Sequence, residues 1–277
     1  MTNLNFRDAL SIVQILLYSP AIIIAIILCI RHGFRKSSGW RFLLTFILAR
    51  LLSSSFQLAT INDPTNKSLY IGEWVLLATA LSPFELMALG LLSRALGSIE
   101  RVRGVGFVKI TTRHIQWVEL LNTVAFVLGI VGGVKADKSY DSTTGGVPTV
   151  QTESKVSIIL LIVILGFLVV ATALTGQQIG FAQPGEKRVL VAVAVSLPFM
   201  FVRMMYSAIG MFNSHETTRF SPVWGSVALL FGMGVLMELA VVFIYLAVGW
   251  TLKKIDHSPV ETSSTHEEAE LSKRESV

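Results

Sequence analysis

The chain has 277 residues, of which 52% are hydrophobic and only 15% are charged, and its mean hydropathy is +0.65. Soluble domains carry about 25% charged residues, so this composition excludes an ordinary soluble protein and indicates a membrane protein. The single cysteine, Cys29, lies in an apolar run, which excludes a disulfide framework and a thiolate metal site. The net charge of +5 is concentrated on one side of the predicted spans, so it does not imply nucleic acid as a partner.

Seven apolar segments are long enough to cross a bilayer, which takes about 20 residues. They predict an all-α fold, with one domain of seven transmembrane helices in residues 1–252. The polar residues 253–277 are poor in aromatics and predict a disordered tail. No small-residue cleavage site follows the first apolar segment, so we expect it to be retained. We place the spans at about residues 10–30, 40–60, 70–92, 114–134, 156–175 and 189–212, with the seventh inside 222–250. Kinks are predicted at Pro20, Pro83 and Pro198.

The basic residues are divided unevenly between the two ends of these spans. Fifteen of the 23 lysines and arginines fall after spans 1, 3 and 5 or in the tail, whereas six fall on the opposite side. The positive-inside rule then places the N-terminus outside and the C-terminus in the cytoplasm. The sequon Asn66-Lys67-Ser68 also falls on the outer side, where an asparagine can be glycosylated. We therefore expect a multi-pass integral membrane protein with Asn66 as a candidate glycosylation site.

Charged side chains inside the predicted spans are the strongest sign of a specific role. Arg50 lies near the middle of the second span, WRFLLTFILARLLSSSFQLAT, where an isolated guanidinium costs about 2.5–3.5 kcal/mol even on lenient insertion scales. Such a residue usually faces the bundle interior and pairs with a carboxylate. Arg203 is a second buried cation in the sixth span. The candidate carboxylate partners are Glu85, Glu119 and Glu238, with Glu73 nearer the outer interface. The sequence thus predicts a bundle arranged around a buried ionic cluster.

Helical spacing indicates which of these polar residues share a face. Four predicted spans carry such residues three or four positions apart, which is what an internal polar cavity requires. The sets are Arg50, Ser54 and Gln57; Gln116, Glu119 and Asn122 or Thr123, with Trp117 beside them; Arg203, Tyr206 and Ser207; and Gly234, Glu238 and Tyr245. The pair Gly132-Gly133 and the run Gly232-Met233-Gly234 are interpreted as sites of close helix packing.

The ionic residues allow two interpretations. Arg–Glu pairs between membrane helices can simply fix packing and register. Alternatively, two buried cations facing three buried anions leave a carboxyl without a full partner, and burial favours the protonated form of such a group. A protonated carboxyl in a low-dielectric pocket suits a reaction that begins with proton transfer. For the set as a whole we favour a function, because charges inside membranes are rare and costly.

Several other chemistries lack the residues they need. No aspartate lies within a predicted span, so no aspartate pair is placed to hold Mg²⁺ and a diphosphate. The sequence has no HExxH motif and no cluster of Cys and His for zinc. No P-loop or GxGxxG opens a helix, and the seventh span has no lysine to anchor a retinal. We therefore expect neither a metal nor a cofactor.

Short motifs carry a family resemblance along the whole chain except the tail. They are Gly39-Trp40-Arg41 leading to Arg50, Glu85 in span 3, Arg203-x-x-Tyr206-Ser207 in span 6 and Met237-Glu238 in span 7. This pattern resembles a fungal family of small seven-span integral membrane proteins. Some of its members are similar to the membrane-bound terpene cyclases of meroterpenoid pathways, which close the farnesyl chain of ascochlorin- and ascofuranone-type compounds.

The resemblance implies acid-triggered cyclisation of a prenylated aromatic, begun by protonation of a terminal epoxide or alkene without a metal. Fitted to the buried groups, this reaction would take its proton from Glu238 or Glu85, while Arg50 and Arg203 hold and position the acid. Carbocations would be stabilised by aromatic faces. The further candidate residues are Glu119 and Tyr206 for the site, and Trp74, Trp117, Phe199 and Tyr206 for the aromatic faces.

Two other functions remain open from the sequence. A transporter or lipid exporter of similar size and topology would use the same charges as a translocation route. A seven-span receptor or sensor is a third interpretation. The short cytoplasmic loops make it less attractive than the other two. For the leading hypothesis the partners are the lipid bilayer and a lipophilic small-molecule substrate, a prenylated aromatic. No nucleic acid or protein partner is inferred.

Overall fold

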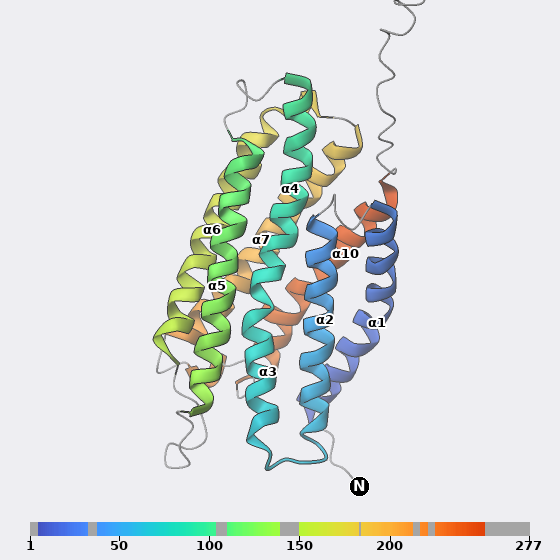
Figure 1. Ribbon diagram of the computed structural model, residues 1–277. Coiled ribbons are helices and arrows are strands. Elements are labelled where there is room, and N and C mark those ends of the chain that lie inside the picture. Colours follow the sequence, from blue (N-terminus) through green and yellow to red (C-terminus); the bar gives the residue numbers. More distant parts are fainter. Residues whose placement is uncertain are drawn as a thin grey trace, which may run out of the picture.

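The computed structural model describes residues 5–32, 38–103, 110–138, 150–182, 184–212, 217–220 and 225–252. Within these ranges the chain is helical almost throughout and has no strand (Figure 1). The predicted tail, residues 253–277, lies outside the described residues.

Seven of the described segments are long and apolar enough to cross a membrane, which confirms the predicted number of spans. The long helices are α1 (Phe6–His32), α2 (Ser38–Ala59), α3 (Lys67–Thr79), α4 (Leu81–Arg103), α5 (Thr112–Lys138), α6 (Thr152–Gly176), α7 (Pro184–Phe212) and α10 (Leu236–Thr251). Four short segments complete the described structure: the 3₁₀ turn η3 (Ile179–Phe181), α8 (Thr217–Phe220), α9 (Val227–Leu229) and the π-helical segment η4 (Leu230–Val235).

The third predicted span consists of two helices, α3 and α4, which meet at Ala80. Pro83 lies in the first turn of α4, where a proline removes no helical hydrogen bond because the first N–H groups have no partner within the helix. The backbone stays continuous across the junction, since Ala80 N donates to Leu76 O at 3.0 Å and Phe84 N donates to Ala80 O at 3.1 Å. Pro20 and Pro198 instead lie inside α1 and α7, which both continue past them.

The span formed by α3 and α4 is the centre of the bundle. In the most apolar 18-residue stretch of this span, 83% is buried inside the bundle. The corresponding share in the other six spans is 28–50%. Helix α4 contacts α2, α5, α6 and α7. Around it, α1 packs against α2, α5 against α6, α6 against α7, α7 against α10, and α10 against α1 (Figure 1). Residues of this central span therefore face protein on nearly every side.

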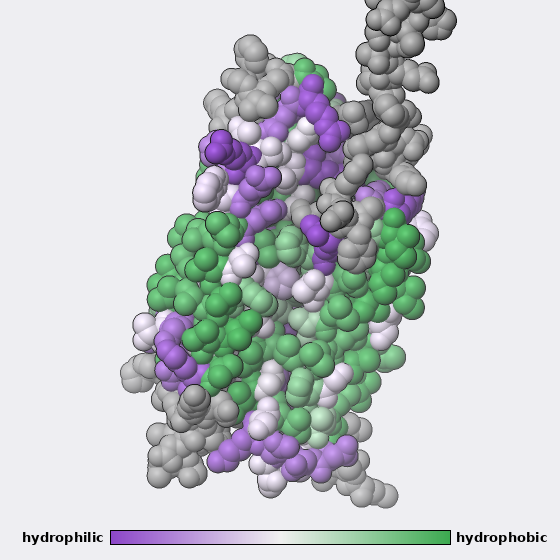
Figure 2. All heavy atoms as spheres, viewed as in Figure 1, coloured by the Kyte–Doolittle hydropathy of each residue, from purple (hydrophilic) through white to green (hydrophobic). Residues whose placement is uncertain are grey.

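The outer surface is apolar around the middle of the bundle and polar at both ends (Figure 2). Large apolar side chains with half or more of their surface exposed lie on several helices, among them Leu16, Ile23, Leu48, Val127, Val163 and Phe201. In water such a belt would be an extensive exposed hydrophobic patch, whereas in a bilayer it is the lipid-facing surface.

Helix α5 closely approaches α6 and α3 at the predicted glycine pair. A Cβ added to Gly132 would lie 2.7 Å from the backbone N of Ser154, and one added to Gly133 would lie 2.6 Å from Val75. The interpretation of Gly132-Gly133 as a packing site is thus confirmed. That of Gly232-Met233-Gly234 is wrong, because a Cβ on Gly232 would meet nothing within 4 Å and one on Gly234 would meet only Leu230 of the same helical segment.

The orientation of the chain can be tested at Asn66. This residue precedes α3, is exposed, and its side-chain oxygen accepts from Ser68 N at 3.2 Å, which leaves the amide nitrogen free of that bond. If the N-terminus is outside, the protein made in a eukaryotic host should carry one N-glycan, and digestion with an N-glycosidase should increase its electrophoretic mobility.

The variant Asn66→Gln should migrate like the digested protein. An unmodified wild-type chain, together with a C-terminal tag accessible only from the outside of intact cells, would contradict the predicted orientation.

Candidate functional site

A carboxylate bound by two guanidinium groups lies in the interior of the bundle. Glu238 Oε2 is 2.7 Å from Arg50 Nε, and Glu238 Oε1 is 2.5 Å from Arg203 Nε. The three side chains are almost completely buried, with 1%, 1% and 3% of the surface of Glu238, Arg50 and Arg203 exposed. We call this group the ionic triad. Its formation confirms the predicted pairing of Arg50 with a carboxylate and selects Glu238 among the candidates.

Three helices bring the triad together. Arg50 lies in the second half of α2, Arg203 follows Pro198 in α7, and Glu238 is in the first turn of α10. The π-helical segment η4 ends directly before α10. Such segments are rare and are often found at functional sites. The triad thus links the second, sixth and seventh spans at one depth.

Polar neighbours make further hydrogen bonds with the triad. Arg50 Nη2 donates to Gln14 Oε1 at 3.1 Å, and Ser54 Oγ donates to the same oxygen at 3.4 Å. Arg203 Nη1 donates to Ser207 Oγ, and the Arg203 guanidinium lies 5.6 Å from the centre of the Tyr206 ring. The predicted stripes on α2 and α7 therefore do face the interior.

The triad carries more positive than negative charge. Two guanidinium groups share one carboxylate, so the three side chains together bear one net positive charge. Each ion loses its hydration on burial, and the attraction offsets this cost only when the geometry is good and further hydrogen bonds are made. Both Glu238 oxygens are engaged with guanidinium groups, which makes this carboxylate a poor source of a proton.

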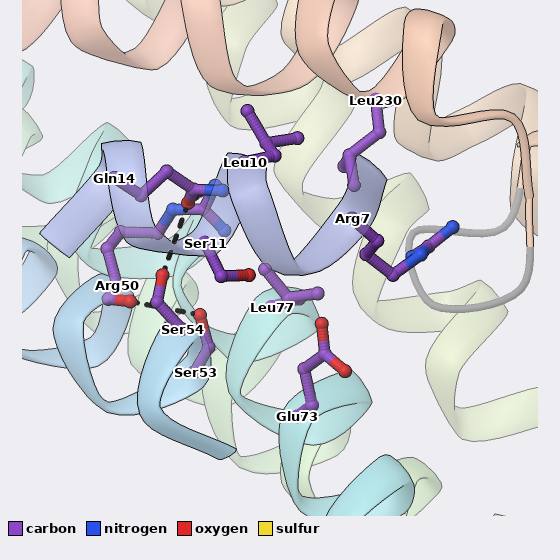
Figure 3. Close-up of a pocket in the computed structure, with 10 residues that line it drawn as sticks. All are labelled: Arg7, Leu10, Ser11, Gln14, Arg50, Ser53, Ser54, Glu73, Leu77 and Leu230. Carbon is purple, nitrogen blue, oxygen red and sulfur yellow. Dashed lines mark hydrogen bonds between the residues drawn. The ribbon is translucent and has the colours of Figure 1, made fainter. Parts of the chain in front are cut away.

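A small pocket extends from the triad toward the end of the bundle where α1 begins and α2 ends (Figure 3). We call it the ionic pocket. Its polar lining comes from α1, α2 and α3, and consists of Arg7, Ser11, Gln14, Arg50, Ser53, Ser54 and Glu73.

Two more carboxylates are buried at this end of the bundle. Asp8 is 4% exposed and accepts hydrogen bonds from Gln57 Nε2 and from the backbone N of Asn5, both at 3.0 Å. Glu73 is 5% exposed, and its Oε2 has no hydrogen-bond partner among the described residues. The sequence placed Glu73 near the outer interface but left Asp8 outside the first span, which begins earlier than predicted.

Glu85 belongs to a different polar cluster, between α4 and α5. Its side chain is fully buried, and Glu85 Oε2 accepts from Asn122 Nδ2 at 3.2 Å. Asn122 Oδ1 in turn accepts from Ser82 Oγ. Within the described ranges no ion pair reaches Glu85, and its Oε1 has no hydrogen-bond partner. We call this group the acid cluster. A buried carboxyl without a cation is accommodated at least cost in its neutral, protonated form.

The predicted polar face of the fourth span is wrong in most of its members. Of the residues assigned to it, only Asn122 is buried. Glu119 is half-buried and takes no part in the triad, while Gln116 and Thr123 are exposed. Trp117 is 63% exposed, so it cannot line an internal cavity. Helix α5 is the least buried span, and its polar residues near the ends lie outside the bundle interior.

The other aromatic candidates lie inside or at the edge of the bundle. Trp74 is 6% exposed, Tyr206 is 1% exposed and Phe199 is half-buried. Tyr245 is fully buried, and its hydroxyl lies 2.6 Å from Ser196 Oγ. The described residues contain no group of three or more His, Cys, Asp or Glu side chains that could hold a metal ion.

Sequence reasoning missed the contribution of the first span to the site. Gln14 bonds Arg50 directly, and Arg7 and Ser11 line the ionic pocket. The available signal was their spacing, because positions 7, 11 and 14 share one face of a helix, as Arg50, Ser54 and Gln57 do. This signal was weak, because serine and glutamine are common near the ends of membrane spans.

The fold and these two polar sites define a class of protein. It is a multi-pass integral membrane protein, a seven-helix bundle that buries an ionic triad and a separate carboxyl. The chain belongs to the DUF7702 family, described as a domain of unknown function, whose family model matches residues 4–255. Comparison with curated proteins gives no match.

Removal of the bridging carboxylate should strongly destabilise the bundle. Glu238→Gln leaves Arg50 and Arg203 buried without a counter-ion, and breaking a buried ion pair in this way costs about 3–5 kcal/mol. Denaturant unfolding of the detergent-solubilised protein, followed by tryptophan fluorescence, measures the loss.

Glu119→Gln is the matched control. It changes a half-buried carboxyl that is outside the triad, so its unfolding free energy should stay within about 0.5 kcal/mol of the wild-type value. Equal stability of the two variants would show that the triad does not hold the bundle together.

Proposed function

We propose that this chain is an integral membrane terpene cyclase that closes a prenyl chain by acid catalysis, with Glu85 as the proton donor. The observation that carries the proposal is the acid cluster: Glu85 is fully buried and hydrogen-bonded to Asn122, and no cation is paired with it among the described side chains. A neutral carboxylic acid in an apolar interior is the group that a proton-initiated cyclisation requires.

The two acids named from the sequence differ in their surroundings. Glu238 contacts Arg50 and Arg203, and two adjacent positive charges favour its ionised form. Glu85 has no such contact and accepts a hydrogen bond from a neutral amide. The proton donor is therefore assigned to Glu85, and the triad is assigned a structural role that positions the helices around it.

The proposed reaction is an isomerisation. The Glu85 O–H proton passes to the oxygen of a terminal epoxide, and the C–O bond on the more substituted carbon breaks. The electron pair of the neighbouring alkene closes the ring and moves the positive charge along the chain. The final cation loses a proton from an adjacent carbon to the Glu85 carboxylate, which restores the acid. No atom is gained or lost overall, and no metal or redox step is required.

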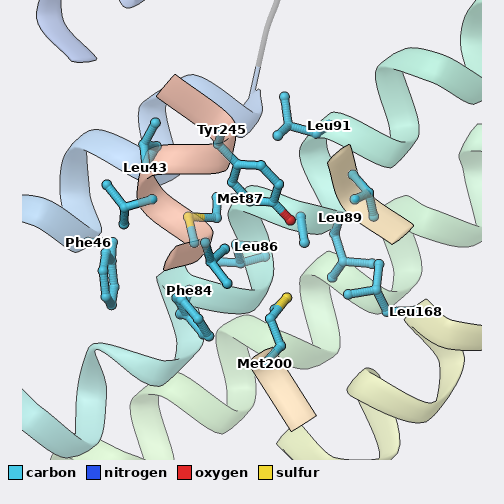
Figure 4. Close-up of a cluster of buried hydrophobic side chains, with 14 of the residues drawn as sticks. Leu43, Phe46, Phe84, Leu86, Met87, Leu89, Leu91, Leu168, Met200 and Tyr245 are labelled. Carbon is cyan, nitrogen blue, oxygen red and sulfur yellow. The ribbon is translucent and has the colours of Figure 1, made fainter. Parts of the chain in front are cut away.

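An aromatic pair lies on the face of α4 that packs against α2. Phe84 packs against Phe46 with ring centres 5.1 Å apart, next to an apolar layer that includes Met87, Met200 and Tyr245 (Figure 4). Aromatic faces attract cations, by about 2 kcal/mol or more when both are desolvated.

Glu85→Gln should abolish the activity and spare the fold. The amide keeps the size of the side chain and an oxygen for Asn122, but it cannot donate the proton. Microsomes containing the protein are incubated with an epoxyfarnesyl phenol, and isomeric products are quantified by liquid chromatography and mass spectrometry. The rate should fall at least 100-fold, which is the low end for general acid catalysis, while the unfolding midpoint stays near the wild-type value.

Glu119→Gln serves as the matched control here as well and should cyclise at the wild-type rate. Full activity in Glu85→Gln, or no cyclised product from the wild-type protein with any epoxyfarnesyl phenol, would contradict the proposal.

A transporter or lipid exporter is the second candidate, favoured by the ionic pocket. The pocket is lined by Arg50 of the triad, and it is flanked by the α3–α4 junction and by the segment η4. Interrupted helices around a charged site are typical of transporters. Accumulation of a solute in proteoliposomes without any change in its mass would support this function, and equal uptake by Arg50→Lys, Glu73→Gln and the wild-type protein would exclude the pocket as its route.

A further inference from the structure

We propose that Ser82 and Asn122 are positioning residues that hold the acidic proton of Glu85 on its Oε1 atom. The inference rests on the proposed function for its place in catalysis, since it names the atom from which the proton is donated. The hydrogen bonds that carry it belong to the acid cluster itself, so they can be measured without any turnover.

The bond from Asn122 determines which oxygen of Glu85 carries the proton. In a neutral carboxyl group the carbonyl oxygen accepts hydrogen bonds, whereas the hydroxyl oxygen has one hydrogen to donate. Asn122 Nδ2 is a donor and lies 3.2 Å from Glu85 Oε2, which is therefore the carbonyl oxygen. The hydroxyl oxygen is then Oε1, which is buried and has no hydrogen-bond partner among the described residues.

Ser82 determines which way the Asn122 amide faces. An asparagine side chain has an acceptor oxygen on one side and a donor nitrogen on the other, so it can offer either of them to a carboxyl group. Asn122 Oδ1 accepts from Ser82 Oγ, which leaves Nδ2 to face Glu85. If the amide faced the other way, Oδ1 would accept the acidic proton and retain it inside the cluster. The Ser82 hydroxyl thus keeps the proton of Glu85 available.

The fold holds the three side chains in place. Ser82 and Glu85 are three positions apart in α4 and share one face of this helix, while Asn122 lies on α5, which packs against α4. Ser82 is 2% exposed, and Glu85 and Asn122 are 0% exposed, so bulk water does not compete for their hydrogen bonds. A buried polar atom without a partner is costly, and the bonds within the cluster therefore fix the orientation of the amide.

A purely structural role of these bonds predicts a different outcome. They also join α4 to α5, so their loss would lower the stability whether or not they orient the acid. Orientation changes two further properties. One is the C=O stretching frequency of Glu85, which is lower when the carbonyl oxygen accepts a hydrogen bond, and the other is kcat. The stretching frequency is the decisive property, because it is measured without substrate.

The test is infrared difference spectroscopy of the detergent-purified protein. The C=O stretching band of a neutral carboxyl group that Glu85→Gln removes is the band of Glu85. In Asn122→Leu this band should move to higher frequency, because the carbonyl oxygen loses its donor. In Ser82→Ala it should shift as well, because the amide is no longer held in one orientation. Ser82→Thr keeps the hydroxyl and should restore the wild-type frequency.

Ser157→Ala is the matched control. The Ser157 hydroxyl is also buried and also bonds α5, since it donates to Ala125 O at 2.6 Å, but it lies outside the acid cluster. This variant should lower the unfolding midpoint and leave the Glu85 band in place.

The activity arm uses an epoxyfarnesyl phenol as the substrate. Ser82→Ala should lower kcat by about 10- to 100-fold with little change in KM, as expected when a reacting group is misplaced. If the bands shift as expected but the wild-type protein cyclises no substrate, the proposed function fails and the position of the proton stands.

A Glu85 band at the wild-type frequency in folded Asn122→Leu and folded Ser82→Ala would overturn the inference. So would the absence of any neutral carboxyl band that Glu85→Gln removes. If Asn122→Leu does not fold, Ser82→Ala and Ser82→Thr decide in the same way.

Discussion

The carboxylate of Glu238, held between two guanidinium groups at 2.7 and 2.5 Å, is the interaction on which the rest of the structure depends. In hydrocarbon neither Arg50 nor Arg203 is tolerated without a counter-ion, and one carboxylate serves both. The helices α2, α7 and α10 must therefore meet at a common depth and with fixed rotations. Apolar packing between membrane helices is much less selective, because lipid tails are as apolar as the side chains that they replace.

The central position of α4 separates the polar interior into two sites. On one side α1, α2, α3, α7 and α10 enclose the triad and the ionic pocket, where every charge has an opposite charge nearby. On the other side Glu85 faces Asn122 of α5, with neutral partners only among the described residues. These sites differ in the chemistry they favour: the first suits binding of charged groups, and the second suits storage and donation of a proton. This difference is why the proton donor of the proposed cyclisation is assigned to Glu85.

Much of the architecture follows from local patterns. Seven apolar segments are long enough to cross a bilayer. Each must be helical, because lipid offers the backbone N–H and C=O groups no other hydrogen-bond partner. Seven spans are therefore predicted, however the helices pack against one another. The stripes on α2 and α7 were also predicted correctly, since positions three and four apart share a face in any helix. On α5 the same rule failed, because Gln116, Glu119 and Thr123 share a face that turns away from the bundle, and periodicity does not tell which face is inside.

The sequence by itself determined the helices, their number and the presence of costly buried charges, because hydropathy and helical spacing are local properties. Only the tertiary structure decided that Arg50 and Arg203 share Glu238, that Gln14 of α1 joins them, and that Glu85 stands apart with Asn122. Partner choice depends on helix rotation and on which helix becomes central, and these result from the packing of all seven spans together. Three glutamates that look equivalent along the chain thus end as a triad member, an isolated acid and a peripheral residue.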